Sequence, residues 1–240
     1  MWKIDAAGLH YRELNSILRT LKNDNVERIE LHNVHGQRYI GTNLKADIPI
    51  DVYGTPGNDL GAFMNSPHIV VHGNVQDGVG NTMNHGQIVV HGHAGDVTGY
   101  SMRGGKIFIR DDVGYRAGIH MKQYKDKIPL LMVGGEAQDF LGEYMAGGIL
   151  IVLELRRTVH KPRFVGTGMH GGTIYLRGEA SSLGKDVKNV ELREQDKNLL
   201  KNLVEEFCNY FNLDAERILD HRFSKIIPVS HRPYGRIYAY

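Results

Sequence analysis

Residues 80–105 read GNTMNHGQIVVHGHAGDVTGYSMRGG, and this stretch holds two copies of one repeat. The tetrapeptide Gly-x-x-Met occurs in it twice and four more times in the flanking sequence, with spacings of 19, 19, 19, 24 and 24 residues between successive methionines. A unit this short cannot bury its own apolar face, so it must stack on copies of itself. The repeat therefore predicts a solenoid. Its methionine column comprises Met64, Met83, Met102, Met121, Met145 and Met169.

Short apolar runs separate the tetrapeptides. They are rich in β-branched residues and bounded by glycine, which favours strands, and they are too short and too closely spaced for helices. A unit of about 19 residues that returns to the same strand position is typical of one coil of a right-handed parallel β-helix. We expect a mainly β solenoid of about six to seven coils, and six coils would form a rod of roughly 30 Å. The runs are residues 69–71, 88–90, 107–109, 130–133, 149–153 and 174–176.

The repeated positions have a structural interpretation. The methionines are expected to point into the rod as adaptable core fillers, and the glycines to supply corners with positive φ. An acidic or amide residue also precedes four of the tetrapeptides, and such side chains can hydrogen-bond their own backbone in a turn. These four residues are Asn58, Asp77, Asp96 and Asp139.

The two ends of the chain are predicted to cover the solenoid, because a bare end would be an open sheet edge. Residues 8–23 carry apolar residues at helical spacing, and strand-like segments at 26–32 and 38–40 follow. An apolar stripe predicts a helix at about 192–211, and a short helix is expected near 214–220. We therefore divide one structural domain into an N-terminal α/β cap over 1–47, the β-helix over 48–180, and a C-terminal helical cap and tail over 181–240.

Composition favours a soluble globular protein, since 41% of the 240 residues are hydrophobic and 23% are charged. No apolar run is long enough to span a membrane and no signal peptide follows Met1, so we expect no membrane association and a cytoplasmic location. The net charge of +2, without a long basic run, gives no reason to expect nucleic acid as a partner. The single cysteine, Cys208, excludes internal disulfides and cysteine-ligated clusters within these residues, and we interpret it as a buried helix residue.

Several longer strings are more specific than glycine richness. They are YRELN (11–15), NVHGQRYIG (33–41), YGTPGNDLGAFM (53–64), residues 80–105, GYRAGIHMKQYKDK (114–127), DFLGEYMAGG (139–148), GTGMHGGTIYLRG (166–178) and RPYG (232–235). Together they resemble the GXGXG domain of glutamate synthase, which forms the C-terminal part of the large subunit in the conventional enzyme. Because this chain starts at its own Met1 and lacks the amidotransferase and flavin-binding domains, it resembles the split form, in which the domains are separate polypeptides. A more distant likeness is to the C component of formylmethanofuran dehydrogenase, which shares the repeat.

The resemblance implies a structural role and no catalytic residue in this chain. In glutamate synthase, glutamine is hydrolysed in the amidotransferase domain, and ammonia passes through a tunnel to the flavin site, where 2-oxoglutarate becomes glutamate. The GXGXG domain packs against the other domains and helps to hold the tunnel in register. The implied partners are amidotransferase and FMN-binding subunits, with the FMN and an iron–sulfur cluster on those partners and no cofactor in this chain. Self-association of the isolated chain into a homo-oligomer stays open.

The histidines offer one candidate metal site. His72 and His91 occupy the same column one coil apart, which stacking would bring to within about 5 Å, and paired imidazoles can share a metal. A structural interpretation is a stacked pair at a strand end, hydrogen-bonded to turns or water. The next member of the column is Arg110, and no carboxylate or third histidine is expected there. We therefore favour the structural pair over a metal site, and interpret His120 and His170 as turn residues.

The two longer spacings mark basic insertions that leave different corners of consecutive coils. Solenoids place such insertions on exposed faces, where binding commonly occurs, although a solvated loop is an equal alternative. The predicted docking residues are Lys122, Lys125, Arg156, Arg157 and Lys161. Three functions stay open: a scaffold subunit of split glutamate synthase, a scaffold like the C component of formylmethanofuran dehydrogenase, and a stand-alone metal-binding β-helix enzyme.

Overall fold

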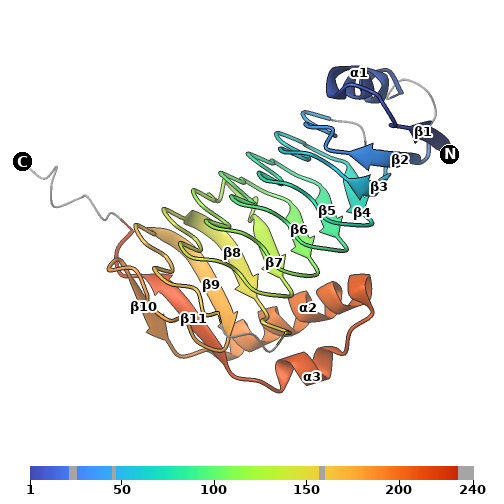
Figure 1. Ribbon diagram of the computed structural model, residues 1–240. Coiled ribbons are helices and arrows are strands. Elements are labelled where there is room, and N and C mark those ends of the chain that lie inside the picture. Colours follow the sequence, from blue (N-terminus) through green and yellow to red (C-terminus); the bar gives the residue numbers. More distant parts are fainter. Residues whose placement is uncertain (22–25, 45–46, 157–159, 232–240) are drawn as a thin grey trace, which may run out of the picture.

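One sheet of 11 strands runs through the part of the molecule that the structure describes (Figure 1). The computed structural model describes residues 1–21, 26–44, 47–156 and 160–231. Strands β1 to β9 follow each other in parallel, so the predicted mainly β solenoid is confirmed, with about 7 turns. The parallel strands are β1 (Trp2–Asp5), β2 (Ile29–His35), β3 (Ile50–Thr55), β4 (His68–Val71), β5 (Gln87–Val90), β6 (Lys106–Ile109), β7 (Leu130–Val133), β8 (Ala146–Val152) and β9 (Gly171–Arg177).

The register explains the spacing of the sequence repeat. Ile50, Ile69, Ile88 and Ile107 pair in succession, so a step of 19 residues returns the chain to the same position of the next strand. The apolar runs of the sequence therefore become the rungs of one ladder. Inserted residues enlarge two of the later turns without shifting this ladder, which continues in register through Leu131, Leu150 and Ile174.

The six repeated methionines are fully buried, as predicted, and belong to the core cluster inside the coils. Four of them, Met64, Met83, Met121 and Met145, extend beneath a corner glycine of the following coil. At Gly86, for example, an added Cβ would lie 2.7 Å from Met64 Cε. An unbranched thioether can occupy this irregular space, because its three rotatable bonds adapt to the corner.

Corners with positive φ are formed by more than the glycines. In the coil that contains Gly99 (φ 75°), Val97 and Ser101 also have positive φ, at 51° each. The Val97 N–H donates to Tyr115 O in the following coil at 2.8 Å, whereas the Gly99 N–H donates to Val79 O in the preceding coil at 2.7 Å. N–H groups two residues apart in the corner thus bond to the coils on opposite sides. The corners are therefore hydrogen-bonded between coils just as the strands are.

The repeated aspartates bond differently from our expectation. Asp77 Oδ1 accepts from the backbone N–H of Asp96 at 2.9 Å, and Asp96 Oδ1 accepts from the N–H of Tyr115 at 2.7 Å. Asp139 accepts in the same way from the N–H of Arg163, one coil further along the chain. The prediction of turns closed within one coil was therefore wrong for these residues. Stacking places the N–H of the next coil within reach, and the carboxylates tie neighbouring coils together.

At the N-terminus, the parallel sheet extends into the segment that we assigned to a cap. Helix α1 (Tyr11–Leu21) covers the open end of the rod and buries Leu14 and Leu18 in the core. The strand predicted at residues 38–40 was wrong. These residues lie in a turn with Tyr39 at φ 62°, and Leu44 occupies the buried position that methionine holds in later coils.

At the C-terminus, strands complete the sheet and a long helix flanks it (Figure 1). Strand β11 (Phe223–Pro228) pairs antiparallel with β9, and β10 (Val187–Val190) pairs antiparallel with β11. Helix α2 (Glu194–Phe211) lies along the outer face of the sheet, followed by the short α3 (Ala215–Leu219). Among the described residues, no helix is long and apolar enough to cross a lipid bilayer.

Candidate functional sites

Four aromatic rings stack along the strand ends of the first coils. The ring centroids of His32 and Tyr53 are 4.7 Å apart, those of Tyr53 and His72 are 4.5 Å apart, and those of His72 and His91 are 5.5 Å apart. The edge of Phe211, the last residue of α2, meets His91 at 5.1 Å. The predicted pair of histidines is thus part of a longer column that begins at His32, so the expectation of no third histidine in the column was wrong.

A carboxylate also reaches this column, contrary to our expectation. Asp51, two residues before Tyr53 on β3, accepts from Arg28 Nε through Oδ2 at 2.6 Å and contacts His72 Nε2 through Oδ1 at 2.9 Å. Burial disfavours its charge, yet the hydrogen bonds from Arg28 and His72 lower the pKa of Asp51 below its usual value. Both carboxylate oxygens are therefore used within the protein. Among the described residues, no group of three or more histidine, cysteine, aspartate or glutamate side chains is arranged to hold a metal ion.

The first insertion projects into solvent. Lys122 and Lys125 are exposed, and Lys125 Nζ lies 5.5 Å from the ring centroid of Tyr124. Tyr124 and Ile128 are about half exposed, at 53% and 51%. This segment thus presents basic and apolar side chains together, as a docking surface would.

The second insertion is bound to the solenoid more closely than its sequence suggests. Arg156 Nη2 lies 2.8 Å from Asp111 Oδ1, and two residues after the insertion Arg163 Nη2 lies 2.7 Å from Asp139 Oδ2. These cations neutralise carboxylates of neighbouring coils. Of the other predicted docking residues, Lys161 is exposed, and Arg157 lies outside the described residues.

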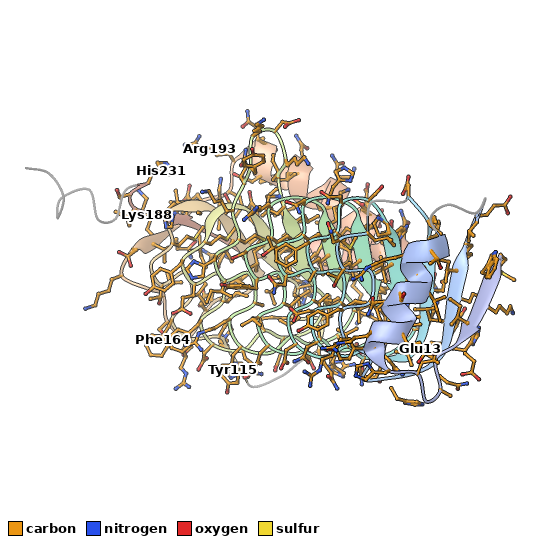
Figure 2. The ribbon with its side chains drawn as sticks, turned by 90° about the horizontal axis from the view of Figure 1, so that it is seen from above. Glu13, Tyr115, Phe164, Lys188, Arg193 and His231 are labelled. Atoms are coloured by element: carbon orange, nitrogen blue, oxygen red, sulfur yellow. The ribbon has the colours of Figure 1, made fainter. Side chains whose placement is uncertain are left out.

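Exposed aromatic side chains lie at the turns of the later coils. Tyr115 and Phe164 are 48% and 46% exposed, and Figure 2 shows them on the same side of the solenoid. The rings of Phe140 and Phe164 stack at 5.1 Å, and the Arg116 guanidinium lies 5.2 Å from the Phe140 ring centroid. Arg116, Phe140 and Phe164 are held in place because each one stacks on a side chain of the neighbouring coil.

Helix α2 is anchored at its start by a buried polar network. Asp196 Oδ1 accepts from Tyr175 Oη and from Lys225 Nζ, both at 2.6 Å, and Asp196 Oδ2 accepts from the Arg193 N–H. Burial opposes ionisation of Asp196, but the hydrogen bonds from Lys225 and Tyr175 lower its pKa. Cys208, further along the helix, is buried as predicted, and burial raises the pKa of its thiol to about 11. A thiol with this pKa is protonated at neutral pH and is a poor nucleophile.

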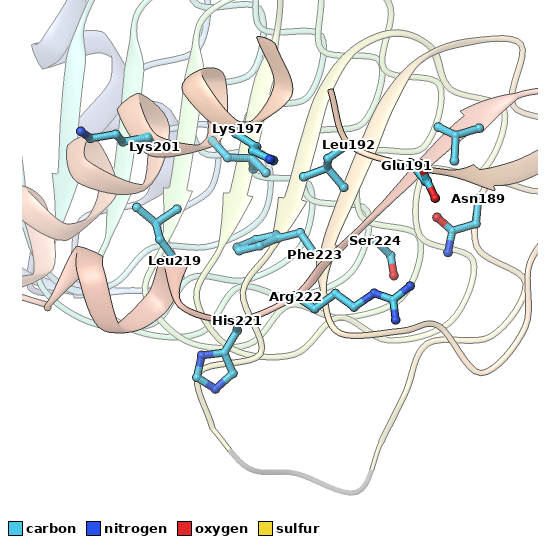
Figure 3. Close-up of a pocket in the computed structure, with 12 residues that line it drawn as sticks. Asn189, Glu191, Leu192, Lys197, Lys201, Leu219, His221, Arg222, Phe223 and Ser224 are labelled. Atoms are coloured by element: carbon cyan, nitrogen blue, oxygen red, sulfur yellow. The ribbon is translucent and has the colours of Figure 1, made fainter. Parts of the chain in front are cut away.

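A groove opens between α2 and the β10–β11 pair, with a volume of about 770 Å³ (Figure 3). Its floor is apolar, formed by Leu192, Leu200, Leu219 and Phe223. Sequence analysis missed this groove, because it depends on β11, a strand that was not predicted. Its rim carries the polar side chains of Asn189, Glu191, Lys197, Lys201, His221, Arg222 and Ser224.

Comparison with known families is consistent with this architecture. The family model described as the GXGXG motif matches residues 12–229, which is most of the chain. The chain belongs to the GXGXG family. Positions 164, 166 and 168 all have positive φ, and two of them are glycine.

A curated relative and a solved structure extend this comparison. The uncharacterized protein MJ1350 of Methanocaldococcus jannaschii is 51% identical over 249 residues, covering 98% of this chain and 95% of the relative. The fold is similar to that of a chain in the formyltransferase/hydrolase complex FhcABCD from Methylorubrum extorquens, crystallised with methylofuran, with a TM-score of 0.63. That match covers 92% of this chain and 89% of the other at 17% identity, so it shows a shared fold.

Proposed function

We propose that this chain is a non-catalytic structural subunit of a split glutamate synthase, acting in cytoplasmic ammonia assimilation. In this proposal it supports separate amidotransferase and FMN-binding subunits during glutamine-dependent glutamate synthesis. The FMN and an iron–sulfur cluster would be held by those partners. Membership of the GXGXG family over residues 12–229 supports this assignment.

The structural role is supported by what the repeated side chains contact. The repeated methionines are buried, and aspartates such as Asp77 and Asp96 bond the backbone of the next coil. The carboxylate nearest the histidine column, Asp51, is bonded to Arg28 and His72. Positions repeated from coil to coil therefore build the solenoid, and a scaffold needs this rigidity to hold partners in register.

Affinity purification of the tagged chain from its native host tests the proposal. We expect the chain to recover an amidotransferase subunit and a flavin-containing subunit, and the isolated chain to lack glutamate synthase activity until these are added. Recovery of neither subunit under conditions that preserve complexes would contradict the proposal. Equilibrium dialysis against zinc tests the metal-enzyme alternative, which requires stoichiometric binding that His72→Gln abolishes.

A second candidate is a scaffold subunit of a formylmethanofuran dehydrogenase type of complex. The similarity to a chain of the FhcABCD complex favours it, although at 17% identity this likeness concerns the fold. The same purification separates the two candidates, because this alternative predicts recovery of formyltransferase or tungsten- or molybdenum-containing subunits in place of a flavoprotein.

Docking through the insertions is a further part of the proposal. Lys122, Lys125 and Lys161 are exposed and suited to a partner with acidic side chains. Charge reversal of Lys122 and Lys125 is expected to weaken co-purification with the flavin subunit. Arg156 is a poorer test residue, because its reversal would also break the ion pair with Asp111. Unchanged recovery of the Lys122→Glu/Lys125→Glu variant would remove the first insertion from the interface.

A further inference from the structure

The groove between α2 and β11 has the composition of a docking site. Leu192, Leu219 and half-buried Val190 line it together with the buried Leu200 and Phe223. Polar side chains surround this apolar floor on both sides. An apolar centre with a polar rim is the usual anatomy of a protein–protein interface, and a volume of about 770 Å³ accommodates several side chains.

The charge of the rim distinguishes among possible occupants. Three cations, Lys197, Lys201 and Arg222, line the groove, whereas Glu191 is the one carboxylate among its lining residues. Figure 3 shows Lys197 and Lys201 on α2 and Arg222 on the other side of Phe223, so positive charge borders the apolar floor on two sides.

These cations are available to a partner. Lys201 Nζ lies 4.0 Å from the exposed Glu205, and Lys197 pairs with Glu194, whose side chain is 79% exposed. No ion pair joins Arg222 to any other described residue. Exposed pairs of this kind contribute little to stability and exchange readily. A carboxylate brought in by a partner can therefore compete for the lysines and can pair with Arg222 directly.

We propose that this groove binds an apolar segment of a partner subunit that carries carboxylates at its edges. The apolar side chains of the segment occupy the floor between Leu192, Leu219 and Phe223, and its carboxylates pair with Lys201 and Arg222. The identity of the complex rests on the proposed function, whereas the chemistry of the segment rests on the groove. None of the described residues that line the groove belongs to the two basic insertions.

Co-purification of groove variants in the native host tests this inference. The double reversal Lys201→Glu/Arg222→Glu is expected to lower recovery of one partner subunit by about tenfold, because opposed charges at an interface become repulsive. Lys188→Glu is the matched control, since Lys188 is an exposed cation on β10 that does not line the groove (Figure 2). Thermal unfolding of each variant confirms that recovery is compared between folded proteins.

Photo-crosslinking locates the segment. A benzoylphenylalanine at position 219 is expected to link to a partner peptide that contains apolar residues and at least one carboxylate. Reversal of that carboxylate to lysine should restore recovery of the Lys201→Glu/Arg222→Glu variant. The same probe at Leu213, which is 39% exposed and outside the groove, provides the background.

The outcomes separate the two proposals. Full recovery with the double reversal overturns the groove and leaves the proposed function intact. A crosslink between two copies of this chain, or to a basic peptide, also overturns the groove as a site for a partner subunit's acidic segment. If the wild-type chain recovers no partner subunit, both proposals fail.

Discussion

The outer face of the sheet has two halves with different chemistry. On β1 to β3 the central outward row is Lys3, Glu30 and Asp51, whose charges pair with one another or with neighbouring side chains. From β4 onward the same row becomes apolar, and α2 covers it from β5 to β9. The covered members of the row are Val89, Phe108, Met132, Ile151 and Tyr175, all with at most 2% of their surface exposed.

The inner face shows no such change, because it is apolar from Ile29 to Ile174. The inner face of every coil must therefore be apolar. The polarity of the outer face instead depends on what packs against it. One half of the outer face carries charged side chains that form ion pairs, and the other half is apolar and covered by the helix.

The largest effect is expected from removing the central contact of the covered half. Phe207 is fully buried and packs edge-on against Phe108, with ring centroids 6.2 Å apart. Phe207→Ala should lower the free energy of unfolding by about 3–5 kcal/mol, since it leaves a cavity beneath α2. Urea unfolding followed by circular dichroism measures this change. A loss below about 1 kcal/mol would show that α2 contributes little to the covered half.

A somewhat smaller effect is expected at the start of α2. Asp196→Ala removes the acceptor shared by Tyr175 and Lys225 and should cost about 2–4 kcal/mol at neutral pH. Because the pKa of Asp196 is lowered in the folded state, its contribution is present above the unfolded pKa of about 4 and is lost as pH falls through the folded value. The gap between wild type and variant should therefore narrow in acid. A gap that widens below pH 4 would contradict this assignment.

In the uncovered half, a comparable polar group should matter less. Asp51→Asn weakens the contacts with Arg28 and His72, but the Arg28 side chain is 53% exposed and water can replace it. We expect a loss of about 1 kcal/mol in the same unfolding experiment. A loss as large as that of Asp196→Ala would indicate that the two halves do not differ as proposed.

The smallest effect is expected at the junction of the halves. His91→Gln removes a ring that stacks on His72 and meets Phe211, at a cost below about 1 kcal/mol. Burial, assisted by nearby His72 and Arg110, lowers the pKa of His91, so in wild type this group reduces stability as pH falls below about 6.5. The difference between wild type and variant should shrink between pH 8 and pH 5, and a constant difference would argue against a buried neutral imidazole.

The inner face of the solenoid could be predicted because its sequence pattern repeats from coil to coil. The methionine column, the strands and the coil length follow from spacing, because each coil repeats the environment of the one before it. The N-terminal coil escaped notice because Leu44 replaces methionine and Gly41 stands 20 residues before Gly61. His32 was missed in the histidine column because Tyr53 separates it from His72.

The covering of the outer face depends on contacts between segments that are far apart in the sequence. The sequence therefore did not show which element covers this face. The stripe on α2 predicted a buried face but could not show that this face meets the flank of the sheet. The contact between Lys106 and Glu206 joins residues 100 positions apart. The groove additionally requires β11, whose strand follows a helix and lacks the repeat that identified the others.

The attachment of α2 at both ends couples the length of this helix to the number of coils. Its first turn is fixed at β9 through Tyr175, and its last turn meets β4 through the contact between His68 and Tyr210. An 18-residue helix spans about 27 Å, and the five steps from β9 to β4 span about 24 Å at about 4.8 Å per step. A coil inserted or deleted beneath α2 would displace one attachment by a full strand spacing. The length of α2 therefore limits how many coils this part of the solenoid can contain.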